Sequence, residues 1–309
     1  MLTVIGEALI DEVLRPGAEA TPHVGGSPMN VAVGLARLDH PVQFLGRYGQ
    51  DAYGAMISEH LQRNSVLLPW PSDESPTSVA RAVLDHDGAA SYDFKLTWEL
   101  PGLAKKLDFL LQGSTLLHTG SIASMLAPGA AEVKQAVLAA RGHATISYDP
   151  NYRPSIITDS DYARAQAEEF VRLADVVKAS DEDLEMLYPG TDPLDAARQW
   201  LGLGPALVVV TRGSSGPWAV AACGEVSVAA PKIRVADTVG AGDSFMSALL
   251  SAIVDRELDG AQRREQLQAL SREQLQDILH FAATAAAITV SRPGADPPNK
   301  NELREALNH

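Results

Sequence analysis

Short apolar segments alternate with amphipathic segments along most of the chain, and this alternation constrains the fold more than any other feature. Apolar, strand-like runs lie at residues 1–5, 41–45, 116–119, 144–148, 176–179 and 206–211. Helix-like segments with apolar residues on one face lie between them, at residues 27–38, 51–62, 130–141, 162–173 and 194–201. Strands that alternate with helices form a parallel sheet covered on both faces. We therefore expect one α/β domain over residues 1–309.

Two β-rich segments, residues 11–24 and 77–96, interrupt this alternation. The first contains the turn signal Pro16-Gly17, and the second contains Asp87-Gly88 between two extended runs. An Asp-Gly pair in that setting is a strong hairpin signal. We expect the two segments to form a small separate β layer that covers the main domain. An edge hairpin of the main sheet is the alternative.

The composition excludes several classes of function. A net charge of −14 disfavours a nucleic-acid partner, which requires a basic surface. The longest apolar run, residues 239–254, contains Asp243 and falls short of the about 20 residues that span a membrane. Cys223 is the only cysteine, and the N-terminus lacks a signal-peptide pattern, so we expect a cytoplasmic protein without a membrane partner.

The segment DTVGAGDSF, at residues 237–245, leads into an apolar helix. Gly240, Ala241 and Gly242 then lie at the helix N-terminus, where small residues let an anion approach free backbone N–H groups. Asp243 lies in the same turn, and the helix dipole favours its ionised form. A carboxylate base beside an anion hole is what phosphoryl transfer to a hydroxyl requires. An ordinary helix cap is the alternative.

A glycine pair precedes another predicted helix, in the segment Gly25-Gly26-Ser27-Pro28-Met29-Asn30. The glycines allow a ligand to approach the backbone, and Pro28 suits the first turn of a helix. The amide of Asn30 both donates and accepts hydrogen bonds, so it can bind sugar hydroxyls. A glycine turn with Asn30 on the helix surface is the alternative.

Two polar loops follow predicted strands of the sheet. Residues 211–216 (TRGSSG) are rich in glycine, which is typical of a nucleotide site and also of a tight turn between strands. Residues 149–154 (DPNYRP) place Asp149 and Arg153 at the carboxyl edge of the sheet. Arg153 can pair either with a phosphate or with Asp149 in a structural salt bridge.

The phosphate-binding motifs of several other kinase classes are missing. The chain has no Gly-Lys dipeptide, which a Walker A loop requires, and no Gly-x-Gly-x-x-Gly after the first strand. The catalytic motifs of protein kinases are also absent. A phosphoryl group would therefore have to be bound at residues 240–243.

Taken together, GGSPMNVAVGLARL (residues 25–38) and DTVGAGDSF (residues 237–245) resemble the two signatures of the ribokinase/fructokinase (PfkB) family of carbohydrate kinases. The resemblance spans nearly the whole chain. It is strongest to the fructokinase branch at residues 6–11 (GEALID), 46–54 (GRYGQDAYG), 149–154 (DPNYRP) and 291–298 (SRPGADPP). It implies a Rossmann-like (ribokinase-like) α/β domain, with a mostly parallel sheet flanked by helices and a small β-sheet lid.

The resemblance also implies roles for individual residues. Asp243 would be the catalytic base, and Gly240, Ala241 and Gly242 would form the anion hole. The sugar would be bound by Asp11, Gly25, Gly26, Asn30, Tyr92, Phe94 and Arg153. ATP would be bound by Thr211, Gly213, Gly216 and Asp183. A monovalent cation such as K⁺ would be bound through backbone oxygens at Asp237, Val239, Arg292 and Gly294.

One segment departs from the family pattern. The family commonly has an Asn-x-x-Glu segment that helps to organise Mg²⁺ and phosphates, and Ser180-Asp181-Glu182-Asp183 matches it here. The shorter carboxylate of Asp183 would act on the metal through water. We expect ATP and Mg²⁺ as cofactors.

The expected reaction is phosphorylation of the 6-hydroxyl of D-fructose by ATP. Other substrates remain open: another sugar, a nucleoside, or a sugar acid such as 2-keto-3-deoxygluconate, for which Lys95 or Arg153 would bind the carboxylate. A catalytically silent sugar or nucleotide sensor is disfavoured, because Asp243 and both glycines of the anion hole are present. An exposed edge or face of the lid sheet favours a homodimer through the lid.

Overall fold

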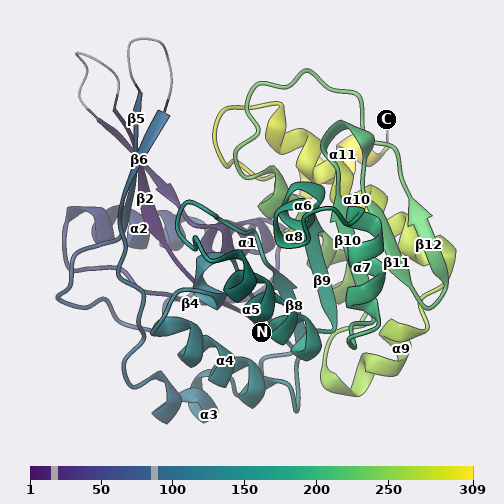
Figure 1. Ribbon diagram of the computed structural model, residues 1–309, viewed down its shortest axis with the longest axis horizontal. Helices are drawn as coiled ribbons and strands as arrows, with labels where there is room; N and C mark the ends of the chain where they lie inside the picture. The colour runs from purple at the N-terminus through teal and green to yellow at the C-terminus, as the bar shows by residue number, and fades with distance from the viewer. Residues whose placement is uncertain (15–19, 85–89, 309) are drawn as a thin grey trace.

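The computed structural model describes residues 1–14, 20–84 and 90–308, apart from the side chains of residues 84 and 90–92. Within this part of the chain, eight strands form the main sheet in the order β12-β11-β10-β9-β8-β7-β1-β4 (Figure 1). Six of them are parallel, namely β1 (Leu2–Ile5), β4 (Val42–Leu45), β7 (Leu116–Gly120), β8 (Thr145–Asp149), β9 (Val176–Ser180) and β10 (Leu207–Thr211). Antiparallel β11 (Trp218–Ala221) and β12 (Gly224–Ser227) complete one edge. The expected mostly parallel α/β sheet is confirmed.

Helices cover both faces of this sheet. One face packs against α1 (Ser27–Arg37), α2 (Ala52–Arg63), α8 (Ala241–Val254) and α10 (Arg272–Val290). The other face packs against α4 (Gly129–Ala140), α5 (Ser160–Leu173), α6 (Asp181–Leu187) and α7 (Pro193–Leu201). The remaining α-helices of the described residues are α3 (Leu107–Leu110), α9 (Arg264–Gln268) and α11 (Lys300–Leu307). Because both faces are covered, successive residues of β10 are buried on opposite sides, which accounts for its unbroken apolar sequence.

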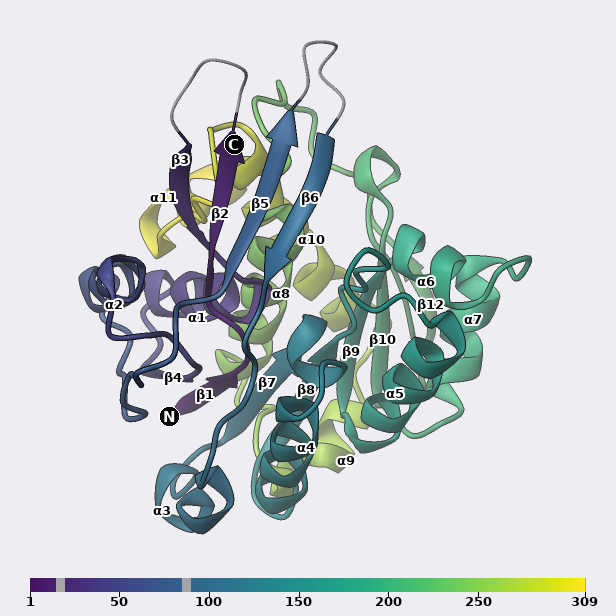
Figure 2. The same ribbon diagram turned by 60° about the vertical axis from the view of Figure 1, so that its left-hand side comes forward.

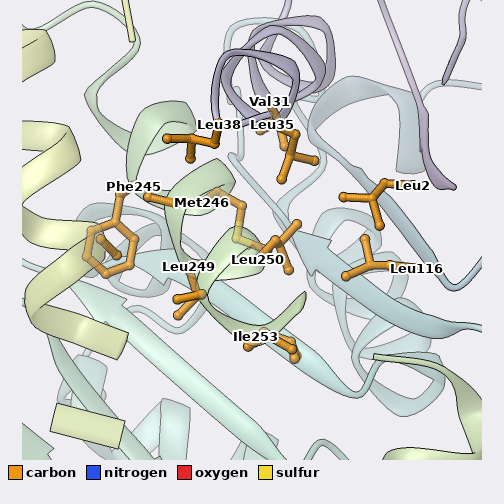
Figure 3. Packing of buried hydrophobic residues seen from close by; sticks show 14 of the residues in the cluster. Leu2, Val31, Leu35, Leu38, Leu116, Phe245, Met246, Leu249, Leu250 and Ile253 are labelled. Carbon is orange, nitrogen blue, oxygen red and sulfur yellow. The ribbon is translucent and has the colours of Figure 1, made fainter. Parts of the chain in front are cut away.

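The central helix α8 lies between the helices α1 and α10 on one face of the sheet. Every residue from Ser244 to Ile253 is buried. Figure 3 shows its apolar side chains meeting those of α1 and of the strands β1 and β7. This helix accounts for the longest apolar run of the sequence, which belongs to a core helix. In the described part of the chain, no helix combines the length and apolarity that crossing a membrane would take.

A second, four-stranded sheet stands apart from the main sheet, in the order β3-β2-β5-β6 (Figure 2). Its strands are β2 (Leu9–Leu14), β3 (Thr21–Gly25), β5 (Val79–Leu84) and β6 (Ala90–Lys95). The two β-rich segments predicted from the sequence therefore do form a separate layer, and the alternative of an edge hairpin on the main sheet is wrong. The two turn signals, at residues 16–17 and 87–88, lie outside the described residues.

Contacts with the start of α2 hold the second sheet in place. The carboxylate of Asp51, which caps α2, accepts hydrogen bonds from the backbone N–H of Thr77 (2.8 Å) and from its hydroxyl (2.6 Å). The hydroxyl of Tyr53 donates to Glu12 on β2, and Arg81 on β5 pairs with the same carboxylate at 2.6 Å. These bonds tie both segments of the second sheet to one helix of the main domain.

Candidate active site

A cleft of about 1850 Å³ lies between the second sheet and the carboxyl ends of the parallel strands. One wall contains β2, β5 and β6, and the other contains the loops after β7, β8, β9 and β10 together with the start of α8. Ligands of α/β proteins bind at this edge of the sheet. Pockets for one small molecule measure about 300–1,000 Å³, so the cleft has room for two ligands.

The start of α8 forms part of the floor of the cleft. Gly240, the residue before the helix, has a left-handed backbone with φ of +74°, and a methyl group on it would lie 2.6 Å from the Cβ of Ala295. Only glycine meets both constraints. The first intrahelical hydrogen bond runs from Ser244 N to Gly240 O, so the preceding N–H groups lie in the turn that lacks intrahelical acceptors. The N–H of Ala241 contacts the carbonyl of Thr238 at 3.3 Å.

Asp243 is held in the first turn of α8 by two side chains from the start of α1. The Ser27 hydroxyl donates to one carboxylate oxygen (2.6 Å), and the Asn30 amide donates to the other (2.8 Å). The two signature segments, which are far apart in the sequence, therefore meet at one carboxylate. Ser27 was missed by the sequence reasoning, which assigned Asn30 to the sugar. The structure shows that both residues orient Asp243.

Most residues predicted to bind the sugar line the cleft, namely Asp11, Gly25, Gly26, Asn30, Phe94 and Arg153. A methyl group on Gly25 would lie 2.1 Å from an Asp11 carboxylate oxygen, so a larger residue there would displace the Asp11 side chain from its present position. Gly26 has φ of +116°, and a methyl group on it would lie 2.5 Å from the Glu7 carbonyl oxygen. The side chain of Tyr92 lies outside the described part of the chain.

Asp11 and Arg153 bring opposite charges to the cleft. The side chain of Asp11 is exposed to the open cleft, yet the protein atoms around it displace enough water to raise its pKa. The charges of His23 and Arg153 act in the opposite direction. Arg153 is also exposed, on the loop after β8. Both side chains are therefore accessible to a polar ligand.

Asp149 is paired with Lys178, and the alternative of an Asp149–Arg153 salt bridge is wrong. Lys178 Nζ lies 2.7 Å from Asp149 Oδ2, and both side chains are buried. Burial raises the pKa of Asp149 to about 6, although the ammonium of Lys178 opposes this rise. The sequence reasoning missed Lys178. Lys178 could have been noticed as the charged residue within the apolar strand VVKAS. A buried lysine almost always has a partner of opposite charge.

Glu7, directly after the first strand, is a second residue that sequence reasoning missed. It lines the cleft although it is only 4 % exposed. Its carboxylate accepts a hydrogen bond from the backbone N–H of Ala123 (3.3 Å) and bonds with Ser121. Burial raises the pKa of Glu7 to about 8 against the effect of these bonds. Ser121 has φ of +55°, a left-handed conformation that is rare for serine.

The residues predicted to bind ATP lie further along the same cleft. Thr211, at the end of β10, lines it together with Gly213 and Gly216 of the loop to the antiparallel β11. This loop is also the tight turn considered as the alternative. A methyl group on Gly216 would lie 2.1 Å from the Val228 carbonyl oxygen. The apolar wall beside the loop was not expected from the sequence and contains Ile233, Val235, Ala283, Ala286, Ala287 and Val290.

Asp183, at the departure from the Asn-x-x-Glu pattern, is buried and fully engaged by protein donors. It forms a reciprocal capping box with Ser180 at the start of α6. One of its oxygens accepts from the Ser180 backbone (3.0 Å) and hydroxyl (2.7 Å), and the other accepts from the backbone N–H of Tyr152 (2.8 Å). The carboxylate thus joins α6 to the loop after β8, at the wall of the cleft.

Three of the residues predicted at a cation site lie together beside α8. Asp237 accepts hydrogen bonds from the backbone N–H groups of Gly294 (2.8 Å) and Val239 (3.1 Å), and these bonds lower its pKa. The side chain of Arg292 points to a carboxylate of Glu302, at 3.1 Å. Asp237, Val239 and Gly294 line the cleft.

Comparison with known proteins agrees with this geometry. The chain matches the model of the pfkB family carbohydrate kinases over residues 1–302. It is 32 % identical to the probable chloroplastic fructokinase-6 of Arabidopsis thaliana, over 98 % of this chain and 81 % of the relative. It is 30 % identical to a fructokinase of Rhizobium leguminosarum bv. trifolii, over 99 % of this chain and 90 % of the relative.

Solved structures show the same fold. A fructokinase from Xylella fastidiosa with bound ATP superposes with a TM-score of 0.89 at 26 % identity, and the match covers 99 % of this chain and 98 % of the other. A putative ribokinase II from E. coli, in complex with ATP and Mg²⁺, superposes with a TM-score of 0.81 at 22 % identity, covering 99 % and 98 %. The chain therefore belongs to the pfkB family of carbohydrate kinases and is a sugar kinase.

Proposed function

We propose that the protein transfers the γ-phosphoryl group of ATP to the 6-hydroxyl of D-fructose, with Asp243 as the general base. The observation that carries this proposal is the position of Asp243, oriented by Ser27 and Asn30 at the N-terminus of α8 and lining the cleft. The choice of sugar is supported by the fructokinases to which the chain is similar.

The chemistry needs one proton transfer and one displacement. The 6-hydroxyl oxygen attacks the γ-phosphorus, its proton passes to Asp243, and the bond from the γ-phosphorus to the bridging oxygen of ADP breaks. Charge on the phosphoryl oxygens would be stabilised by backbone N–H groups at residues 240–242. Ser27 and Asn30 keep the carboxylate directed at the reacting hydroxyl.

The second sheet would act as a lid over the sugar. Asp11 on β2 would bind sugar hydroxyls, while Phe94 on β6 would cover the ring, with Tyr92 as a further predicted contact. Closing such a lid excludes water, which would otherwise compete with the sugar for the phosphoryl group. In this view residues 1–309 form one domain, and the lid is an inserted layer of it.

ATP would lie across the loop of Thr211, Gly213 and Gly216, with its base against the apolar wall around Val235. Mg²⁺ commonly binds through substrate phosphates, waters and one or two carboxylates. Asp183 fits such a role through water, because protein donors already occupy both of its oxygens. A monovalent cation such as K⁺ would use the backbone at Asp237, Val239, Arg292 and Gly294.

The charges of the cleft favour a neutral sugar over a sugar acid. Lys95, one of the two cations considered for a substrate carboxylate, lies with Glu12 and Arg81 in a separate pocket, whereas its neighbour Phe94 lines the main cleft. Adjacent residues of a strand point to opposite faces. Arg153 is then the remaining candidate, and it faces a cleft that also contains the acids Asp11 and Glu7.

The test is ADP formation by the purified protein with ATP, Mg²⁺ and a panel of sugars, a sugar acid and a nucleoside. We expect fructose to be turned over best. Asp243→Asn should lower kcat by about 10²–10⁴-fold, since a positioned base contributes that much. The control is Asp255→Asn, at the opposite end of α8. Preference for another sugar would reject fructose, and an active Asp243→Asn variant would reject the mechanism.

We also propose a homodimer through the lid. In the described part of the second sheet, β3 and β6 are the edge strands. β3 contains Pro22, which lacks a backbone donor and so weakens this edge for pairing. The edge formed by β6 is therefore the better candidate for contact with a second copy.

A further inference from the structure

A buried ion pair lies directly beneath the N-terminus of α8. Asp149 ends β8, and the strand register, which pairs Tyr148 with Val177, brings it beside Lys178 on β9. Lys178 Nζ is 2.7 Å from Asp149 Oδ2, and the two side chains are 4 % and 1 % exposed. That oxygen accepts no well-directed hydrogen bond among the described residues, so proximity of charge holds the pair together.

The ammonium of Lys178 lies close to Gly242, in the first turn of α8, which forms part of the proposed anion hole. A methyl group built on Gly242 would lie 3.1 Å from Lys178 Nζ. Lys178 also lines the cleft despite its burial. A side chain at position 242 would therefore press against this ammonium, and glycine leaves the ammonium close to the first turn of α8.

Burial and the positive end of α8 oppose a charged lysine at this position, whereas nearby carboxylates favour one and raise its pKa. The N-terminus of a helix carries partial positive charge, so a cation there is unfavourable. A buried ion pair is seldom more stabilising than apolar residues of the same size. Three carboxylates, those of Asp149, Asp183 and Asp243, act electrostatically on Lys178. An incoming phosphoryl group would meet their combined negative charge if this ammonium were absent.

We propose that Lys178 is a further phosphoryl-binding residue of the kinase, which adds a full positive charge to the backbone N–H groups of the anion hole while Asp149 positions it. This proposal rests on the proposed phosphoryl transfer but not on the identity of the sugar. Neighbouring His118 adds no competing cation, because burial and the charge of Lys178 lower its pKa to about 3.

The first test replaces the charge and keeps the length of the side chain. Lys178→Met should lower kcat by about 10²–10³-fold on whichever sugar the wild type phosphorylates fastest, the loss expected when one stabilising group of an anion hole is removed. The KM for the sugar should change little. Lys178→Arg should retain more activity than Lys178→Met. The control is Lys134→Met, which removes a lysine paired with Glu169 on the outer helices α4 and α5.

A second variant distinguishes a loss of catalysis from a loss of folding. Lys178→Met alone leaves Asp149 buried without a counter-charge, which can unfold the protein. In the double variant Asp149→Asn/Lys178→Met the pair is neutral, so the melting temperature should recover while kcat stays low. A folded double variant with nearly wild-type kcat would overturn the proposal and leave the pair a structural role only.

Binding measurements without sugar make the test independent of the substrate. Calorimetry should show that the double variant binds ATP at least about tenfold more weakly than the wild type, a loss of about 1.4 kcal/mol, while AMP, which lacks the γ-phosphoryl group, binds equally well. Equal ATP affinity in both proteins would overturn the proposal. Failure of the wild type to phosphorylate fructose would reject only the proposed substrate.

Discussion

Asp243 depends on side chains that come from a distant part of the chain. Its partners Ser27 and Asn30 precede it by 216 and 213 residues and reach it because α1 packs against α8. The local motif, glycines before an acid at a helix start, was readable from the sequence. The orienting role of Ser27 and Asn30 was not, since it requires that the two helix N-termini meet.

Glu7 provides a pH-dependent test at the residue scale. Its pKa rises from 4.5 to about 8 on folding, so the folded state keeps a proton that the unfolded state loses. Its contribution to stability is complete below pH 4.5 and is lost as the pH rises through 8. The Glu7→Gln variant should lack the loss of unfolding free energy that Glu7 causes as the pH rises through 8. Urea unfolding at a series of pH values measures this difference.

The comparison with wild type isolates Glu7, because Asp149, whose pKa rises to about 6, is present in both proteins. The same change at an exposed position, Glu305→Gln, is the control. Identical pH profiles for wild type and Glu7→Gln would contradict the assignment of a proton to Glu7.

At the scale of elements, the start of α6 differs from the family's Asn-x-x-Glu pattern, yet its aspartate forms well-defined hydrogen bonds. Asp183 caps α6 and also accepts from the buried N–H of Tyr152. Asp183→Ala should cost about 2–4 kcal/mol of unfolding free energy, from the lost cap and the unpaired N–H. Urea unfolding measures this loss.

The control for this element is Glu182→Ala, which changes an exposed carboxylate in the same turn. It should stay within about 0.5 kcal/mol of the wild type. Equal losses for the two variants would show that Asp183 does not anchor the loop after β8. The sequence identified Asp183 only through its match to the family pattern. The fold shows that Asp183 lies in the first turn of a helix and that Tyr152 is within its reach.

At the scale of the whole molecule, the proposed dimer predicts a molar mass that rises with concentration in sedimentation experiments. Hydrogen exchange should slow in β6 on association and remain unchanged in β3, because a second copy would cover the β6 edge. A monomeric mass at all concentrations would rule out the dimer. Slowed exchange confined to β3 would place the contact on the other edge.

The sequence by itself determined the alternation of strands and helices, the separate β layer and the small-residue turn before Asp243. Each depends on residues near one another in the chain, through apolar periodicity, turn residues and helix-start chemistry. Only the tertiary structure decided that Asp149 pairs with Lys178 instead of Arg153, that Lys95 faces away from the cleft, and that Glu7 is buried. Strand order, register and burial control those outcomes, and they arise from contacts between segments that the local sequence does not specify.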